Sequence, residues 1–159
     1  MNKFKRILVV VATCLALGYF SGLVTQSSIE TWYPTLVKPS FNPPNWIFAP
    51  VWSMLYIMMG IAAGLVWNRV EFEQETVKKA LVLFAIQLAL NALWSILFFG
   101  LKNPLLALIG IVLLWLMIYE TYLKFSKIDK IASYLMLPYL AWVSFAAVLN
   151  ASLWWLNKG

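Results

Sequence analysis

The sequence contains no histidine, one cysteine and few charged residues. Only 11% of its 159 residues are charged, whereas a soluble globular domain has roughly 25%. The missing histidine removes serine–histidine and cysteine–histidine nucleophilic chemistry, and it removes the commonest ligand of metals and haem. With Cys14 as the single thiol, neither an intrachain disulfide nor a CxxC metal or redox motif can form. We therefore expect no metal site and no resident cofactor.

Apolar residues make up 63% of the chain and fall into five long runs. No charged residue occurs at 7–29, 39–68, 80–101, 103–119 or 131–157. A membrane-spanning helix needs about 20 mostly apolar residues. The sequence therefore predicts an all-α polytopic membrane protein, one five-transmembrane-helix bundle over residues 1–159. The helices are expected near 6–25, 46–67, 78–101, 104–124 and 131–156, with a lid-like loop at 26–45.

The lysine and arginine residues predict the orientation of the bundle. Nine of them lie at the N-terminus or in the second and fourth connections, and the other three are Lys38, Lys102 and Lys158. By the positive-inside rule, the N-terminus is expected inside and the C-terminus outside. The net charge of +6 then reflects membrane topology, and we expect no nucleic-acid partner because no basic patch lies on a soluble fold.

The segment WYPTLVKPSFNPPNW, residues 32–46, carries four of the seven prolines. Proline fixes its own φ and holds the preceding residue in an extended conformation, so the segment is predicted to be stiff. Its aromatic side chains allow two interpretations from the residues alone. The segment either folds over the bundle as a lid or lies among lipid headgroups. Asn45 is expected to cap the second helix.

Three segments together resemble one protein family. They are WYPTLVKPSFNPPNWIFAPVWSMLYIMMG at 32–60, QLALNALWSILFFG at 87–100 and PYLAWVSFAAVLN at 138–150. They resemble the first loop with the second helix, the third helix and the fifth helix of the TspO/MBR family, the translocator proteins. The resemblance implies a five-helix bundle, often dimeric, with a pocket near the first loop. It also implies that this pocket binds tetrapyrroles such as protoporphyrin IX, or drug-like hydrophobic ligands.

The fifth helix repeats Pro138, Trp142, Ala146 and Asn150 every four residues, on one helix face. A small alanine one turn from a tryptophan leaves a slot beside a flat aromatic wall. From the residues alone, a contact between helices is the commoner meaning of a small residue. The resemblance places Trp142 and Ala146 on the pocket wall, together with Trp52 from the second helix. The two tryptophans are therefore our leading candidates for contact with a porphyrin.

The third helix places Gln87, Asn91 and Ser95 on one face. Such groups either hydrogen-bond between helices or bind a ligand. The resemblance supports ligand contacts at Gln87 and Asn91, and we expect Gln87 to lie nearer the ligand while Asn91 holds the loop. Tyr33, pointing into the pocket, and Pro43 complete the expected ligand-binding residues.

Two GxxxG patterns, Gly18–Gly22 and Gly60–Gly64, permit close approach of helices. The pattern does not distinguish packing inside the bundle from packing between protomers. The resemblance nevertheless implies a homodimer, and we expect it in the lipid bilayer of a bacterial cell membrane.

The function implied by the resemblance is a membrane receptor or sensor for tetrapyrroles that can also translocate its ligand. One alternative is an enzyme that degrades porphyrin with light and oxygen, in which Trp52 and Trp142 donate electrons. Another is a passive transporter of hydrophobic ligands, including sterols. The stretch VLNASLWWLNKG lacks the tyrosine that animal members carry in their sterol motif, which argues against sterol binding.

Overall fold

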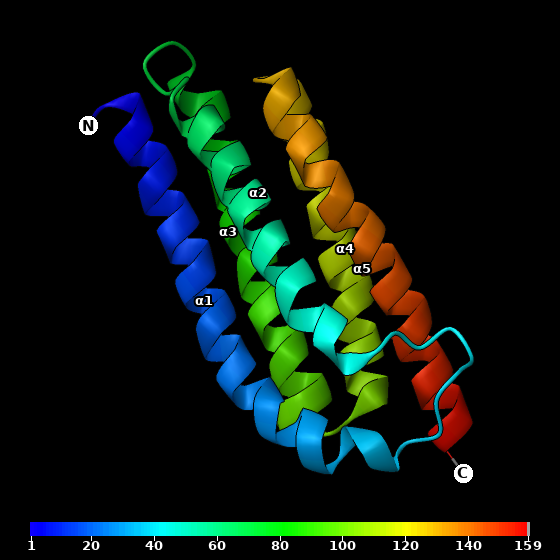
Figure 1. Cartoon of the computed structure of the whole chain (residues 1–159). Coiled ribbons are helices and arrows are strands. Elements are labelled where there is room, and N and C mark those ends of the chain that lie inside the picture. Colours follow the sequence, from blue (N-terminus) through cyan, green and yellow to red (C-terminus); the bar gives the residue numbers. More distant parts are fainter. Residues whose placement is uncertain (159) are drawn as a thin grey trace.

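The computed structural model describes residues 1–158, which form a bundle of five long helices (Figure 1). The helices are α1 (Lys3–Thr31), α2 (Phe48–Trp67), α3 (Gln74–Ser95), α4 (Pro104–Ser126) and α5 (Lys130–Asn157). Each is long and apolar enough to cross a membrane, and the described residues contain no strand. The predicted all-α, five-helix fold is therefore confirmed.

Side-chain caps begin two of the later helices. Asn103 accepts a hydrogen bond from the N–H of Leu106 at the start of α4, and Asp129 accepts one from the N–H of Ala132 at the start of α5. The expected cap by Asn45 is wrong. Residues Asn45–Ile47 form a short 3-10 turn, η2, which leads into α2 without any side-chain cap.

The first helix is longer than predicted. It continues to Thr31, and hydroxyl groups in its last turns bond to the carbonyl four residues earlier, as Thr25 does to Ser21 and Thr31 to Ser27. The predicted loop at 26–45 is correspondingly shorter. It consists of a 3-10 turn, η1 (Tyr33–Thr35), an irregular stretch over 36–44 with a turn at 40–41, and η2.

Around the bundle the helices follow the order α1, α2, α5, α4, α3. The bundle has two ends (Figure 1). The N-terminal end carries the N-terminus and the α2–α3 and α4–α5 connections, and the loop end carries residues 32–47, the α3–α4 connection and the C-terminus. Helix α1 is peripheral, because only 6% of its most apolar 18-residue window is buried, against 33% to 44% in the other four helices.

Towards the N-terminal end, α1 packs directly on two glycines of α2. A Cβ on Gly60 would lie 2.6 Å from the Cα of Val11, and one on Gly64 would lie 2.7 Å from the Cα of Ile7. Backbone therefore meets backbone here, with no room for a side chain. The GxxxG pattern at Gly60–Gly64 accordingly serves packing inside the bundle.

The other GxxxG pattern marks the point where α1 and α2 separate. A Cβ on Gly18 would collide with the Tyr56 ring, whereas one on Gly22, a turn further along, would meet no atom within 4 Å. Nearer the loop end, α1 instead contacts η3 (Ile96–Gly100), a π-helical turn that continues α3. The separation leaves a space enclosed by α1, α2, α5 and η3.

Candidate functional site

This space is a cavity of about 560 Å³ in the half of the bundle nearest the loop end. Its wall consists mainly of aromatic and small side chains from α1, α2, α5 and the α3–η3 segment, with Tyr33 closing it beside the loop. Several of its lining residues are exposed, among them Tyr19 and Gly22 on α1 and Ser53 on α2. The cavity is therefore open sideways between α1 and α2.

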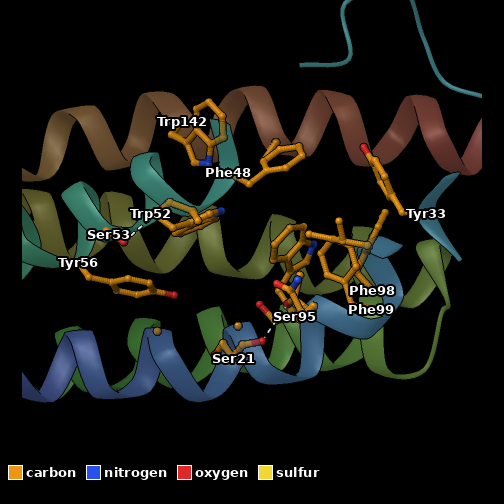
Figure 2. A pocket seen from close by; sticks show the side chains of 18 of the residues that line it. Ser21, Tyr33, Phe48, Trp52, Ser53, Tyr56, Ser95, Phe98, Phe99 and Trp142 are labelled. Carbon is orange, nitrogen blue, oxygen red and sulfur yellow. Dashed lines mark hydrogen bonds between the residues drawn. The ribbon is translucent and has the colours of Figure 1, made fainter. Parts of the chain in front are cut away.

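Two tryptophans from different helices form the central wall of the cavity. The ring centres of Trp52 on α2 and Trp94 on α3 lie 6.3 Å apart with an interplanar angle of 34°. Trp94 continues the wall towards Phe98, whose ring centre lies 5.7 Å away. These distances are within the range of favourable aromatic pairing. Figure 2 shows the rings gathered around one open space, which suits a flat apolar ligand.

Trp142 on α5 faces this wall from the opposite side of the cavity. Its ring packs edge-on against Phe48, 6.4 Å between centres, and its indole N–H is buried without an acceptor among residues 1–158. In contrast, the indole N–H of Trp94 donates to Asn150 Oδ1 over 3.0 Å. A buried donor without a partner costs about 1–3 kcal/mol. The Trp142 N–H is consequently a buried donor without a partner, and a ligand oxygen reaches it only if neighbouring side chains move.

Ala146, one turn after Trp142, also lines the cavity and is buried. Its small side chain leaves the slot beside the indole ring that the sequence predicts. A larger residue at this position would extend into the cavity and reduce its volume.

Tyr33 is the loop residue that reaches the cavity. Its side chain is only 2% exposed, and its ring packs at 88° to Phe48. Its hydroxyl, however, donates to Asn42 Oδ1 within the loop over 2.6 Å. Burial raises the pKa of Tyr33 to about 12, so the hydroxyl stays protonated and keeps this bond. The ring therefore forms part of the wall, while the hydroxyl stabilises the loop.

The rest of the loop is fastened to the end of α5. The Val37 N–H donates to Asn157 Oδ1, and Asn157 Nδ2 donates back to the Val37 carbonyl, each over 2.9 Å. Phe41 adds an edge-on contact with Phe145. In Figure 1 the loop passes beside the C-terminal end of α5 before it returns to α2. Pro43 lies in this fastened stretch and is not among the residues that line the cavity.

Gln87 and Asn91 lie behind the cavity wall in a chain of hydrogen bonds. The Tyr56 hydroxyl donates to Asn91 Oδ1 over 2.7 Å, and Asn91 Nδ2 donates to the Tyr139 hydroxyl over 2.8 Å. That hydroxyl donates to Gln87 Oε1 over 2.7 Å. Only Tyr56, the first member of the chain, lines the cavity.

The order of these residues differs from the expected one. Gln87 was expected nearer the ligand and Asn91 against the loop, but Asn91 is bonded to the cavity wall and Gln87 lies one tyrosine further away. The reason is their position along α3. The cavity lies at the loop end of this helix, so Ser95 reaches it, while Asn91 and Gln87 lie one and two turns further towards the N-terminal end of the bundle.

The structure thus brings four predicted residues, Tyr33, Trp52, Trp142 and Ala146, to one cavity. Sequence reasoning missed Trp94 and Ser95, although the face shared by Gln87, Asn91 and Ser95 already pointed towards Ser95. It also missed the whole α1 wall, although Ser21 and Thr25 lie four residues apart on α1 and both line the cavity. Within residues 1–158, no group of three or more Cys, Asp or Glu side chains could hold a metal ion.

Several known proteins are similar in sequence to this chain over most of its length. The TspO/MBR family profile matches residues 10–156. The chain is 46% identical to the tryptophan-rich protein TspO of Chlorobaculum tepidum over 158 residues, 99% of each chain. It is 40% identical to the translocator protein of Sus scrofa over 128 residues, 80% of this chain and 76% of that protein. It is 39% identical to the tryptophan-rich sensory protein of Cereibacter sphaeroides over 121 residues, 76% of this chain and 73% of that protein. The chain is therefore an integral membrane protein that belongs to the TspO/MBR family.

Proposed function

We propose that the protein is a membrane receptor or sensor that binds a tetrapyrrole in the cavity at the loop end. The observation that carries the proposal is the buried, unpartnered N–H of Trp142, a residue on the wall of a mostly apolar, aromatic cavity. Leaving a buried donor unpaired is costly, and an acceptor on a bound ligand would remove that cost. A flat ligand with an oxygen acceptor suits both this donor and the aromatic wall.

The size and lining of the cavity support this class of ligand. Small-molecule sites are typically about 300–1,000 Å³, mostly apolar, with a few polar groups that fix the orientation. The cavity of about 560 Å³ falls within that range. Its two sides carry Trp52 and Trp142, which can contact the faces or edges of a macrocycle. Gln87 and Asn91 support the wall through Tyr56 and Tyr139 instead of contacting the ligand.

The test is a titration of the detergent-solubilised protein with protoporphyrin IX, followed by quenching of tryptophan fluorescence. Trp142→Phe keeps an aromatic ring but removes the donor, so affinity should fall by about 2- to 12-fold, the effect of one hydrogen bond. Adding Ala146→Leu should weaken binding much further, because the leucine side chain fills the slot.

The matched control is Trp155→Phe, which changes a tryptophan that is 62% exposed and lies outside the cavity. This variant should bind as the parent protein does. Quenching that does not saturate, or a Trp142→Phe/Ala146→Leu protein with unchanged affinity, would contradict the proposal.

A second candidate is porphyrin degradation driven by light and oxygen. The observation in its favour is that electron-rich Trp52, Trp94 and Trp142 all line the same cavity. Under illumination with oxygen, bound porphyrin should then give a distinct product faster than free porphyrin does. Replacement of Trp52 and Trp142 by phenylalanine should abolish that difference. Persistence of the difference in this variant would argue against the enzyme.

For location and assembly, we propose a homodimer in a bacterial cell membrane with the N-terminus inside. The distribution of lysine and arginine between the two ends supports this orientation. Since Gly60 and Gly64 already contact α1, the dimer contact must use another face of the bundle. Labelling of single cysteines at either end with a membrane-impermeant thiol reagent, in a Cys14→Ala background, tests the orientation.

A further inference from the structure

Among the serine and threonine residues on the cavity wall, two have hydroxyl groups that differ from the others. Thr25 and Ser53 also line the cavity, but each donates to the carbonyl four residues earlier, over 2.9 and 2.8 Å. This is the usual bond of a serine or threonine inside a helix. The hydroxyls of Ser21 on α1 and Ser95 on α3 also line the cavity and make no hydrogen bond within residues 1–158. Both are therefore free to donate to a third group.

Ser95 is the more informative of the two. The residue is only 8% exposed, but its Oγ is not fully enclosed by protein atoms, so a group inside the cavity can reach it. It is also the last residue of α3 before the π-helical turn η3, where the Leu101 N–H bonds to the Ile96 carbonyl. Single π turns inside α-helices are frequent at functional sites. The burial and the helix irregularity both indicate that the Ser95 hydroxyl has a role other than filling space.

The two serines lie across the cavity from Trp142. Figure 2 shows Ser21 and Ser95 towards α1 and Trp142 towards α5. The cavity therefore has hydrogen-bond donors at two opposite sides and apolar surface in the middle. That distribution matches a flat apolar body with an oxygen-bearing group at more than one position.

We propose that Ser95, with Ser21 beside it, is a second polar anchor that binds a carboxyl group of the ligand. The proposal rests on the proposed function and adds selectivity to it: the cavity should prefer porphyrins that carry carboxyl side chains over porphyrins that carry only alkyl groups. Ser95 supplies the buried hydroxyl, and Ser21, on the half-exposed side, completes the anchor.

The experiment compares two probes, protoporphyrin IX and etioporphyrin, which has alkyl groups and no carboxyl group. Each is titrated into the full-length protein in detergent, and into the Ser95→Ala, Ser21→Ala and double variants. Ser95→Ala should weaken protoporphyrin IX binding by about 2- to 12-fold, the effect of one hydrogen bond, and leave etioporphyrin binding unchanged. Because the two serines bind one group, the fold-loss of protoporphyrin IX affinity in the double variant should be smaller than the product of the fold-losses in the two single variants.

Ser53→Ala is the matched control, because Ser53 lines the same cavity but its hydroxyl is already bonded to the Ala49 carbonyl. It should not change the preference between the probes. The thermal midpoint of Ser95→Ala should equal that of the parent, since no internal bond is lost. Equal losses for both probes, no loss for either, or a lower thermal midpoint would overturn the second anchor. Failure of the parent to bind either probe would instead contradict the proposed function.

Discussion

Helices α1 and α2 pack closely in one half of the bundle and stand apart in the other half. Towards the N-terminal end, α1 lies so close to α2 that Gly60 and Gly64 meet the backbone of Val11 and Ile7. Towards the loop end, α1 stands apart from α2, and Gly22 faces open space. Small residues occur in both places, but they close the first region and open the second.

We therefore expect the packed half to contribute mainly to stability and the open half to contribute mainly to ligand binding. The packed half is filled by the main hydrophobic core, where side chains such as Met59 and Val66 are fully buried. The open half has a second, smaller aromatic cluster and the cavity. The cavity reaches as far as Tyr56, and the buried core continues from there towards the N-terminal end.

The largest expected effect is on the packed half. Gly60→Leu places a side chain where a Cβ alone would lie 2.6 Å from the Val11 backbone. Overpacking of this kind costs about 1–3 kcal/mol, and the cost should be at the upper end because backbone atoms cannot move aside easily. Thermal unfolding in detergent should show a clearly lower midpoint. An unchanged midpoint would mean that α1 is not held against α2 here.

The next effect concerns the hydrogen-bond chain at the boundary between the halves. Asn91→Ala leaves the Tyr56 hydroxyl without an acceptor and the Tyr139 hydroxyl without a donor, at a cost of about 1–3 kcal/mol. Gln87→Leu removes one acceptor, and its Nε2 already lacks a partner among residues 1–158, so this variant should lose less. Chemical unfolding of both variants compares them. A greater loss for Gln87→Leu would contradict the order of the chain.

In the open half, Gly22→Leu should affect binding instead of stability. A side chain here meets no neighbour, so the free energy of unfolding should stay within about 0.5 kcal/mol of the parent. The leucine would narrow the opening between α1 and α2, and protoporphyrin IX should exchange more slowly. Stopped-flow quenching together with thermal unfolding measures both quantities. The comparison fails if Gly22→Leu unfolds as easily as Gly60→Leu.

The last and most local effect is expected where the loop is hydrogen-bonded to the end of α5. Asn157→Ala removes both hydrogen bonds to Val37, which are exposed, so stability should fall by only about 1 kcal/mol or less. Amide hydrogen exchange at Val37 should accelerate, while Gly60 stays protected in the packed half. If exchange at Val37 does not change, Asn157 does not hold the loop.

Much of the fold was predictable because a membrane imposes a simple pattern. Runs without charge located all five helices, and a face with period four brought Trp142 and Ala146 to the cavity. The end of α1 was missed because its serine and threonine residues suggest a loop. Threonine hydroxyls there instead form hydrogen bonds with carbonyl groups of the same helix, which composition does not reveal. The depth of Gln87 and Asn91 was missed for a different reason. Helical spacing gives the face of a residue but not how far along the bundle a cavity extends.

The most direct test is a structure of the protein with protoporphyrin IX bound. We expect the macrocycle between Trp52 and Trp142, with a ligand oxygen near the Trp142 indole nitrogen. We also expect Gln87 to be separated from the ligand by Tyr56 and Tyr139. A ligand bound on the outside of the bundle, or one in direct contact with Gln87, would contradict this account.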